Sequence, residues 1–120
     1  MEDFVTFELA KKLKEKGFNT EFKYSLGYYD TLGNFMSAAD HWFLDSWIIA
    51  PTISQVLTWL RKEKRIDAGA VWDNRDGKWV GYVNEMDMPD LVGEYVLPDT
   101  YVSYELAALA GIEYVINNLI

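Results

Sequence analysis

The chain has 120 residues, of which 50% are apolar, 16% aromatic and 25% charged, which is typical of a globular rather than a disordered protein. Its 11 basic and 19 acidic side chains give a formal net charge of −8, which disfavours direct nucleic-acid binding. The absence of cysteine excludes a disulfide scaffold, a thiolate zinc site and a cysteine nucleophile. The length predicts a single domain over residues 1–120.

The N-terminal residues lack the basic and apolar regions of a signal peptide. The longest apolar-rich stretch, Trp42 to Ile53, is interrupted by Asp45, Ser46 and Pro51 and falls far short of the roughly 20 residues that span a bilayer. We therefore expect a cytoplasmic protein without a membrane contact.

The first periodic segment predicts a helix from Thr6 to Lys16. Thr6 is the expected N-cap, and lysines crowd the C-terminal half, where the helix dipole favours cations. Gly17 followed by Phe18 is typical of a Schellman ending. The apolar stripe consists of Phe7, Leu9, Ala10 and Leu13.

A half-buried strand is predicted next, since apolar and polar residues alternate over Glu21 to Tyr29. Asp30 to Asn34 has the composition of a turn. The segment HWFLDSWII, residues 41–49, is interpreted as a second strand that pairs back on the first, with a long loop as the alternative.

Pro51 precedes the clearest helix start in the chain. Thr52 and Gln55 match the capping box, and the helix is predicted to continue through Lys64. Its last turn carries four basic residues, in the direction that the helix dipole favours.

A hairpin is predicted from the strand-like runs AGAVW (68–72) and KWVGYV (78–83), which are separated by a turn ending in Asp76-Gly77. An acidic loop over Asn84 to Thr100 follows, with Glu94 to Leu97 as a brief edge strand.

The chain is predicted to end in a helix from Tyr104 to Leu119, capped by Ser103. Gly111 inside it costs about 1 kcal/mol against alanine. The apolar stripe consists of Leu106, Leu109, Ala110, Val115, Ile116 and Leu119.

These elements predict an α+β fold in the order α-β-β-α-β-β-α. We expect a mostly antiparallel sheet of four to five strands with three helices on one face, because long β segments lie between the helices.

Negative charge is concentrated in the second half of the chain. Residues 66–120 carry ten acids and only two bases. A solvated acidic surface is one interpretation; an acidic face that imitates nucleic acid or binds a basic partner, and a divalent-cation site, are the others. The candidates for such a face are Glu85, Asp87, Asp90, Glu94 and Asp99.

His41 is the only histidine, and it lies between Asp40 and Trp42, with Asp45 four residues later. An Asp–His pair can orient a general base, but no nucleophile elbow and no phosphate-binding loop accompanies it. A calcium loop aligned on Asp76-Gly77 would put Trp72 and Val83 where carboxylates are required. We therefore expect no metal and no cofactor.

Five Trp, eight Tyr and six Phe are a large share for this length. Core and sheet packing is the first interpretation; a surplus that forms a patch for a partner or a second copy is the other. Trp42, Phe43 and Trp47 are the candidate anchors of such an interface.

The segments FVTFELAKKLKEKGF and APTISQVLTWLRKEKRI, with a closing helix that begins Tyr104-Glu105, resemble a group of small uncharacterised proteins encoded by gut anaerobic bacteria and their prophages. The resemblance rests on caps and core positions, so it implies a shared fold and no particular activity or catalytic residue.

We therefore expect a non-enzymatic cytosolic protein that acts through protein–protein contact, including homodimer formation, and that is encoded by a prophage or mobile element. Two alternatives stay open. One is an acidic decoy that binds a DNA-handling protein; the other is a small hydrolase or metal-dependent enzyme around His41.

Overall fold

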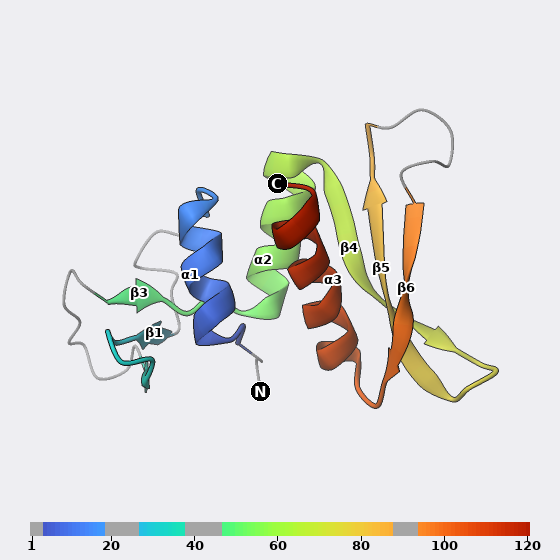
Figure 1. Cartoon of the computed structure of the whole chain (residues 1–120), viewed down its shortest axis with the longest axis horizontal. Helices are drawn as coiled ribbons and strands as arrows, with labels where there is room; N and C mark the ends of the chain where they lie inside the picture. Colours follow the sequence, from blue (N-terminus) through green and yellow to red (C-terminus); the bar gives the residue numbers. More distant parts are fainter. Residues whose placement is uncertain (1–3, 19–26, 38–46, 88–93) are drawn as a thin grey trace. The chain divides into compact units, whose positions relative to one another are not determined.

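Helices and antiparallel strands follow one another in separate runs, which confirms the predicted α+β class (Figure 1). The computed structural model describes residues 4–18, 27–37, 47–87 and 94–120. The contacts divide the chain into two compact units, unit 1 (Met1–Thr52) and unit 2 (Ile53–Ile120). The expectation of one domain stays a prediction.

The expected single sheet of four to five strands is wrong for the part of the chain that the structure describes. There the strands form two three-stranded antiparallel sheets, one in each unit. The short strands of unit 1 pair among themselves, and so do the long strands of unit 2, so no ladder joins the two sets.

Unit 1 begins with helix α1 (Phe7–Glu15), whose two ends form as predicted. The Thr6 hydroxyl accepts a hydrogen bond from the Leu9 amide at 3.2 Å. At the other end, the Phe18 amide donates to the Leu13 carbonyl at 2.9 Å, and Gly17 adopts a φ of +92°. This is the Schellman geometry, in which the glycine takes the left-handed position.

The sheet of unit 1 consists of β1 (Gly27–Tyr29), β2 (Phe35–Ser37) and β3 (Ile48–Ile49), in the order β2-β1-β3. The predicted turn is confirmed, because the Asp30 carboxylate accepts from the amides of Leu32 and Asn34 at 2.9 and 2.8 Å. These bonds lower the Asp30 pKa. The return of the 41–49 segment to the first strand is confirmed for β3 alone, since residues 38–46, like the beginning of the predicted first strand, lie outside the described residues.

Unit 2 begins with α2 (Ile53–Trp59), which starts directly after Thr52 as predicted. The predicted helix changes its winding halfway and continues as the π-helix η3 (Leu60–Lys64). Arg65 ends it at a φ of 57°, with its amide donating to the Leu60 carbonyl five residues earlier. Among the described residues, Arg65 is the non-glycine residue with a positive φ.

The predicted hairpin is confirmed by β4 (Ile66–Asp73) and β5 (Lys78–Glu85). The third strand, β6 (Glu94–Tyr101), is longer than the predicted edge strand. Its register against β5 shifts between Val80 and Tyr82, so that Pro98 falls inside the irregularity. A residue without an amide hydrogen is tolerated there, because no regular ladder bond is required of it.

Helix α3 (Tyr104–Asn118) closes the chain and lies against β4, β5 and β6 (Figure 1). The Ser103 hydroxyl caps it as predicted, accepting from the Leu106 amide at 3.2 Å. The predicted apolar stripe is partly wrong, since Leu106 is 47% exposed. The buried face instead consists of Ala107, Ala108, Gly111, Ile112, Val115 and Ile116.

Small residues bring α3 close to the sheet and turn this face inward. A Cβ added to Gly81 would lie 2.7 Å from the Ala107 carbonyl oxygen, which is closer than real Cβ atoms approach. A Cβ added to Gly111 would lie 3.3 Å from the Tyr82 carbonyl oxygen. The helix therefore packs by backbone proximity as well as by its large side chains.

No helix in the described part of the chain combines the length and the apolar character needed to cross a membrane.

We expect Gly81→Ala to destabilise the protein by about 1–3 kcal/mol, because the added methyl group meets backbone atoms that cannot rotate away. Gly77→Asn is the control, since Gly77 lies in the hairpin turn with a φ of +63° and open space around it, and asparagine tolerates that conformation. Urea unfolding followed by circular dichroism measures both variants. Equal stability of Gly81→Ala and the natural chain would contradict the close approach.

Candidate functional site

The two faces of the β4–β6 sheet differ in cover. Because side chains alternate along a strand, Gly81 and Val83 of β5 face α3, whereas Val80 and Tyr82 face the other side. Val71 of β4 and Val96 of β6 share this other side, here called the open face, and they are 47% and 56% exposed. The open face therefore presents aliphatic side chains to solvent.

A hollow of about 360 Å³ lies on the open face where the hairpin turn meets the sheet. Val71, Val80 and Val96 of the open face supply most of its apolar lining, and Trp72 also borders it. Asp73, Asn74 and Arg75 form its polar rim from the turn.

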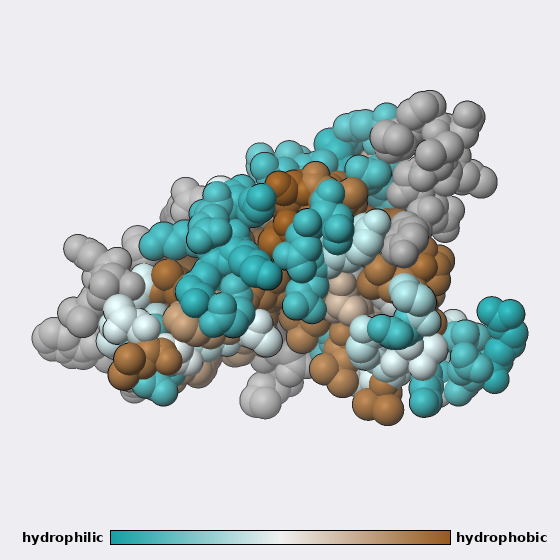
Figure 2. All heavy atoms as spheres, viewed as in Figure 1, coloured by the Kyte–Doolittle hydropathy of each residue, from teal (hydrophilic) through white to brown (hydrophobic). Residues whose placement is uncertain are grey.

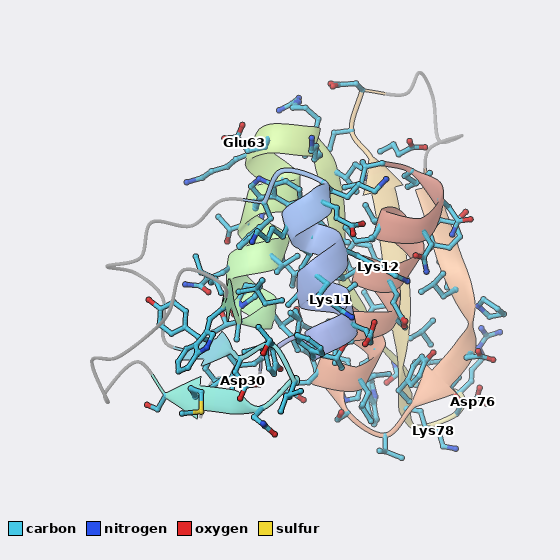
Figure 3. All side chains as sticks on the ribbon, turned by 60° about the vertical axis from the view of Figure 1, so that its left-hand side comes forward. Lys11, Lys12, Asp30, Glu63, Asp76 and Lys78 are labelled. Carbon is cyan, nitrogen blue, oxygen red and sulfur yellow. The ribbon has the colours of Figure 1, made fainter. Side chains whose placement is uncertain are left out.

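The charged groups of this rim are directed toward each other. The Asp73 carboxylate accepts from the Arg75 amide at 2.9 Å, and the Arg75 Nε lies 3.6 Å from the same oxygen. Asp73 is largely covered, whereas the guanidinium is open to solvent, so the ion pair contributes little to stability. Asp76 and Lys78 also extend from this end of the hairpin (Figure 3).

An aromatic cluster occupies the opposite face at the same end of the hairpin. Trp72 contacts Trp79 edge to face with ring centroids 5.4 Å apart, and Trp79 contacts Tyr104 of α3 at 5.4 Å. Trp72 is 50% exposed, and Val102 and Leu106 are also exposed. Figure 2 shows apolar side chains gathered on the surface near the start of α3. Because Trp72, next to Val71 at the edge of the sheet, also borders the hollow, we call Val71, Trp72 and Val96 together the hairpin surface.

Tyr82 covers the glycine opposite it on the open face. Its ring lies 3.2 Å from the position of a Cβ on Gly69, and its hydroxyl donates to the Asp67 carboxylate at 3.4 Å. Burial, together with the nearby negative charge of Asp67, raises the pKa of Tyr82. These contacts identify Tyr82 as a side chain that supports the sheet.

The structure places two residues of the predicted acidic face at neighbouring backbone positions, but their register assigns them to opposite faces of the sheet. Glu85 ends β5, and Glu94, which begins β6, pairs with Asn84 next to it. Asp87 is exposed, and its Oδ1 lies 3.3 Å from the Nε of Arg65. Asp99 is exposed in the irregular part of β6, five residues after Glu94. Asp90 lies outside the described residues. Arg65 thus offsets one of the acids that the sequence placed in this face.

Of the predicted aromatic anchors, Trp47 is half-buried just before β3, and Trp42 and Phe43 lie outside the described residues. Other aromatics of unit 1 pack on one another. Tyr29 lies 5.5 Å from Phe7 and 5.9 Å from Phe35, centroid to centroid, and its hydroxyl donates to the Val5 carbonyl at 2.6 Å.

The histidine site stays a prediction, because Asp40, His41 and Asp45 all lie outside the described residues. Within the described ranges, no three histidine or carboxylate side chains gather where they could hold a metal ion. The Asp73–Gly77 segment is a hairpin turn, with the Gly77 amide donating to the Asp73 carbonyl at 2.9 Å.

Comparison with known proteins gives no family assignment. No family model, no curated protein and no solved structure matches the chain.

The hairpin surface was not among the predicted sites. Period-two alternation marked both hairpin strands, but it does not tell which face a helix covers. Gly81 was the available signal, because a glycine in a strand marks a close backbone approach, whereas Gly69 lies on the open face under Tyr82.

Tyr82 gives the fold a pH dependence at the alkaline end. Its pKa is higher in the folded chain than the ordinary value of 10.0. Its contribution to stability is therefore fully present below about pH 10 and is lost as the pH rises through the folded pKa, because the unfolded chain releases the proton first. We expect the free energy of unfolding of Tyr82→Phe to decrease less steeply with pH in this alkaline range. The urea midpoint measured at several pH values above 9 or so tests it; an unchanged alkaline slope in the variant would contradict it.

Proposed function

We propose that this protein is a non-enzymatic binding protein that acts through contact with another protein, and that the hairpin surface is the contact. The observation that carries the proposal is the hollow on the open face, with exposed Val71 and Val96 at its lining. Exposed apolar groups that gather around a hollow are typical of surfaces that become buried against a partner.

The chemistry of the hollow favours recognition over catalysis. Its apolar lining consists of three valines and Trp72, and its rim carboxylate and guanidinium face each other in the turn. A partner would gain affinity mainly by covering apolar area, with the rim fixing its orientation.

A homodimer is the simplest form of such contact, and we propose it as one state of the protein. The N-terminal sequence, which lacks signal-peptide features, supports a cytoplasmic location, and the resemblance to proteins of gut anaerobic bacteria and their prophages supports an origin on a mobile element.

A second candidate function is an acidic decoy for a DNA-handling protein. Glu85 and Glu94 supply negative charge at one end of the sheet, which supports it, whereas their register on opposite faces and the ion pair between Asp87 and Arg65 weaken it. Binding of this kind would decrease steeply with salt, unlike apolar contact through the hairpin surface.

We expect Val96→Asp to reduce partner recovery on the order of tenfold or more, because a carboxylate cannot be buried in the apolar hollow without a large desolvation cost. Leu32→Asp is the matched control, since Leu32 is an exposed apolar residue of unit 1. Each variant and the natural chain are immobilised, and captured proteins are quantified by mass spectrometry at two salt concentrations.

Equal recovery by Val96→Asp and the natural chain would argue against the hairpin surface. A loss with Leu32→Asp as large as that with Val96→Asp would do the same. Circular dichroism of all three chains shows whether a loss reflects unfolding.

A further inference from the structure

The two edges of the β4–β6 sheet differ in their protection. Strand order places β4 and β6 at the edges, with β5 between them. β6 contains Pro98 and a register shift, two devices that natural proteins use to prevent further strand pairing. β4 pairs with β5 over eight residues in an uninterrupted register and contains no proline or lysine. The β4 edge therefore keeps the backbone geometry that accepts another strand.

Side-chain cover decreases from β5 toward this edge. Val71 is 47% exposed, whereas Val80, its cross-strand partner, is 8% exposed. On the other face, Trp72 is 50% exposed while its partner Trp79 is half-buried. Val71 and Trp72 are neighbours that point to opposite faces. One additional strand beside β4 would cover both.

The two acidic side chains of β4, Asp67 and Asp73, do not prevent another strand from pairing at this edge. The Asp67 carboxylate accepts from the hydroxyl of Tyr82, across the sheet on β5. The Asp73 carboxylate accepts from the Arg75 amide in the turn. Both carboxylates are thus engaged with groups of their own hairpin.

We propose that the occupant of this edge is β4 of a second copy, paired antiparallel about a twofold axis at Val71. The inference rests on the proposed function and names a second copy as the partner of Val71 and Trp72, the two residues that β4 contributes to the hairpin surface. In this register Val71 lies opposite Val71 of the second copy, and Trp72 lies opposite Ala70. The small Ala70 side chain leaves room for the indole on the α3 side of the sheet.

Neighbouring registers are less favourable, one by repulsion between carboxylates and the other by placing a carboxylate against an apolar side chain. Cross-strand partners must share a face, so the register can shift only in steps that preserve the alternation. A step in one direction places Asp67 opposite Asp73, and a step in the other places Val71 opposite Asp73. The register centred on Val71 instead brings Asp67 toward the turn that carries Arg75.

The net charge predicts the salt dependence of this pairing. Each copy carries a formal charge of −8, so two copies repel at long range. Salt screens this repulsion, and the apolar contact persists. The dimer fraction should therefore rise with salt, opposite to the binding of a basic partner.

Val71→Cys tests the register directly. The chain has no other cysteine, and opposite residues of antiparallel strands lie within disulfide range. Under mild oxidation we expect a disulfide dimer to form on the order of tenfold faster than with Val102→Cys, an exposed control position, as expected for preassembled thiols. Val71→Lys should raise the dissociation constant on the order of tenfold, because like charges would face each other. Light scattering after size exclusion measures the mass at low and high salt.

A dimer of the natural chain that strengthens with salt, together with its loss in Val71→Lys, would support the proposal. A monomer at every salt and protein concentration would overturn it, as would equal oxidation rates for the two cysteine variants. A dimer that Val71→Lys leaves intact would overturn the β4 pairing. In each overturning case, continued loss of captured partners by Val96→Asp would leave the proposed function standing.

Discussion

The close approach of α3 to β5 at Gly81 is the constraint on which the arrangement of unit 2 depends. The carbonyl oxygen of Ala107 lies only 2.7 Å from the place where any other residue at position 81 would carry a Cβ. Because the helix comes this close, its small residues face the sheet, and Leu106 is turned outward. The same approach sets Tyr104 against Trp79 at the first turn of the helix. One backbone contact thus determines which apolar side chains become core and which become surface.

The candidate site follows from this one-sided cover. With α3 on one face, the cross-strand neighbours Val71 and Val80 lie on the other, and the turn residues beside them complete a hollow. The outer strand β4 is less covered, since no described strand pairs with it on the side away from β5. As a result, the side chains of Val71 and Trp72, which point to opposite faces of the sheet, are both exposed. Their exposure is a property of strand order, and no feature of their own sequence neighbourhood indicates it.

Local interactions were predictable from the sequence, and long-range ones were not. The caps at Thr6 and Ser103, the Schellman ending at Gly17 and the hairpin turn each involve groups within five residues of one another, so residue type and spacing suffice to identify them. The separation of the strands into two sheets depends on pairings between distant residues. The length of β6 depends on a register shift that lets the strand pass Pro98. The interface anchors were predicted from aromatic content alone. The position of the hairpin surface instead depends on the packing of Gly81 against α3, which decides the face that stays uncovered.

The acidic character of unit 2 acts differently on the candidate partners. Charge acts over about a Debye length of 8–10 Å and falls with salt, whereas apolar contact acts only where surfaces touch. The acids of β4 are held within their own hairpin by Tyr82 and by the turn amide of Arg75. They therefore contribute to the long-range field without interrupting the apolar edge between them. In the proposed dimer, two copies approaching through β4 would have to overcome this field before Val71 and Trp72 make contact, so the net charge would limit self-pairing. In such a dimer, an edge that is attractive at short range and repulsive at long range would hold two chains weakly, so that dissociated copies would keep the hollow available for the proposed contact with a different protein.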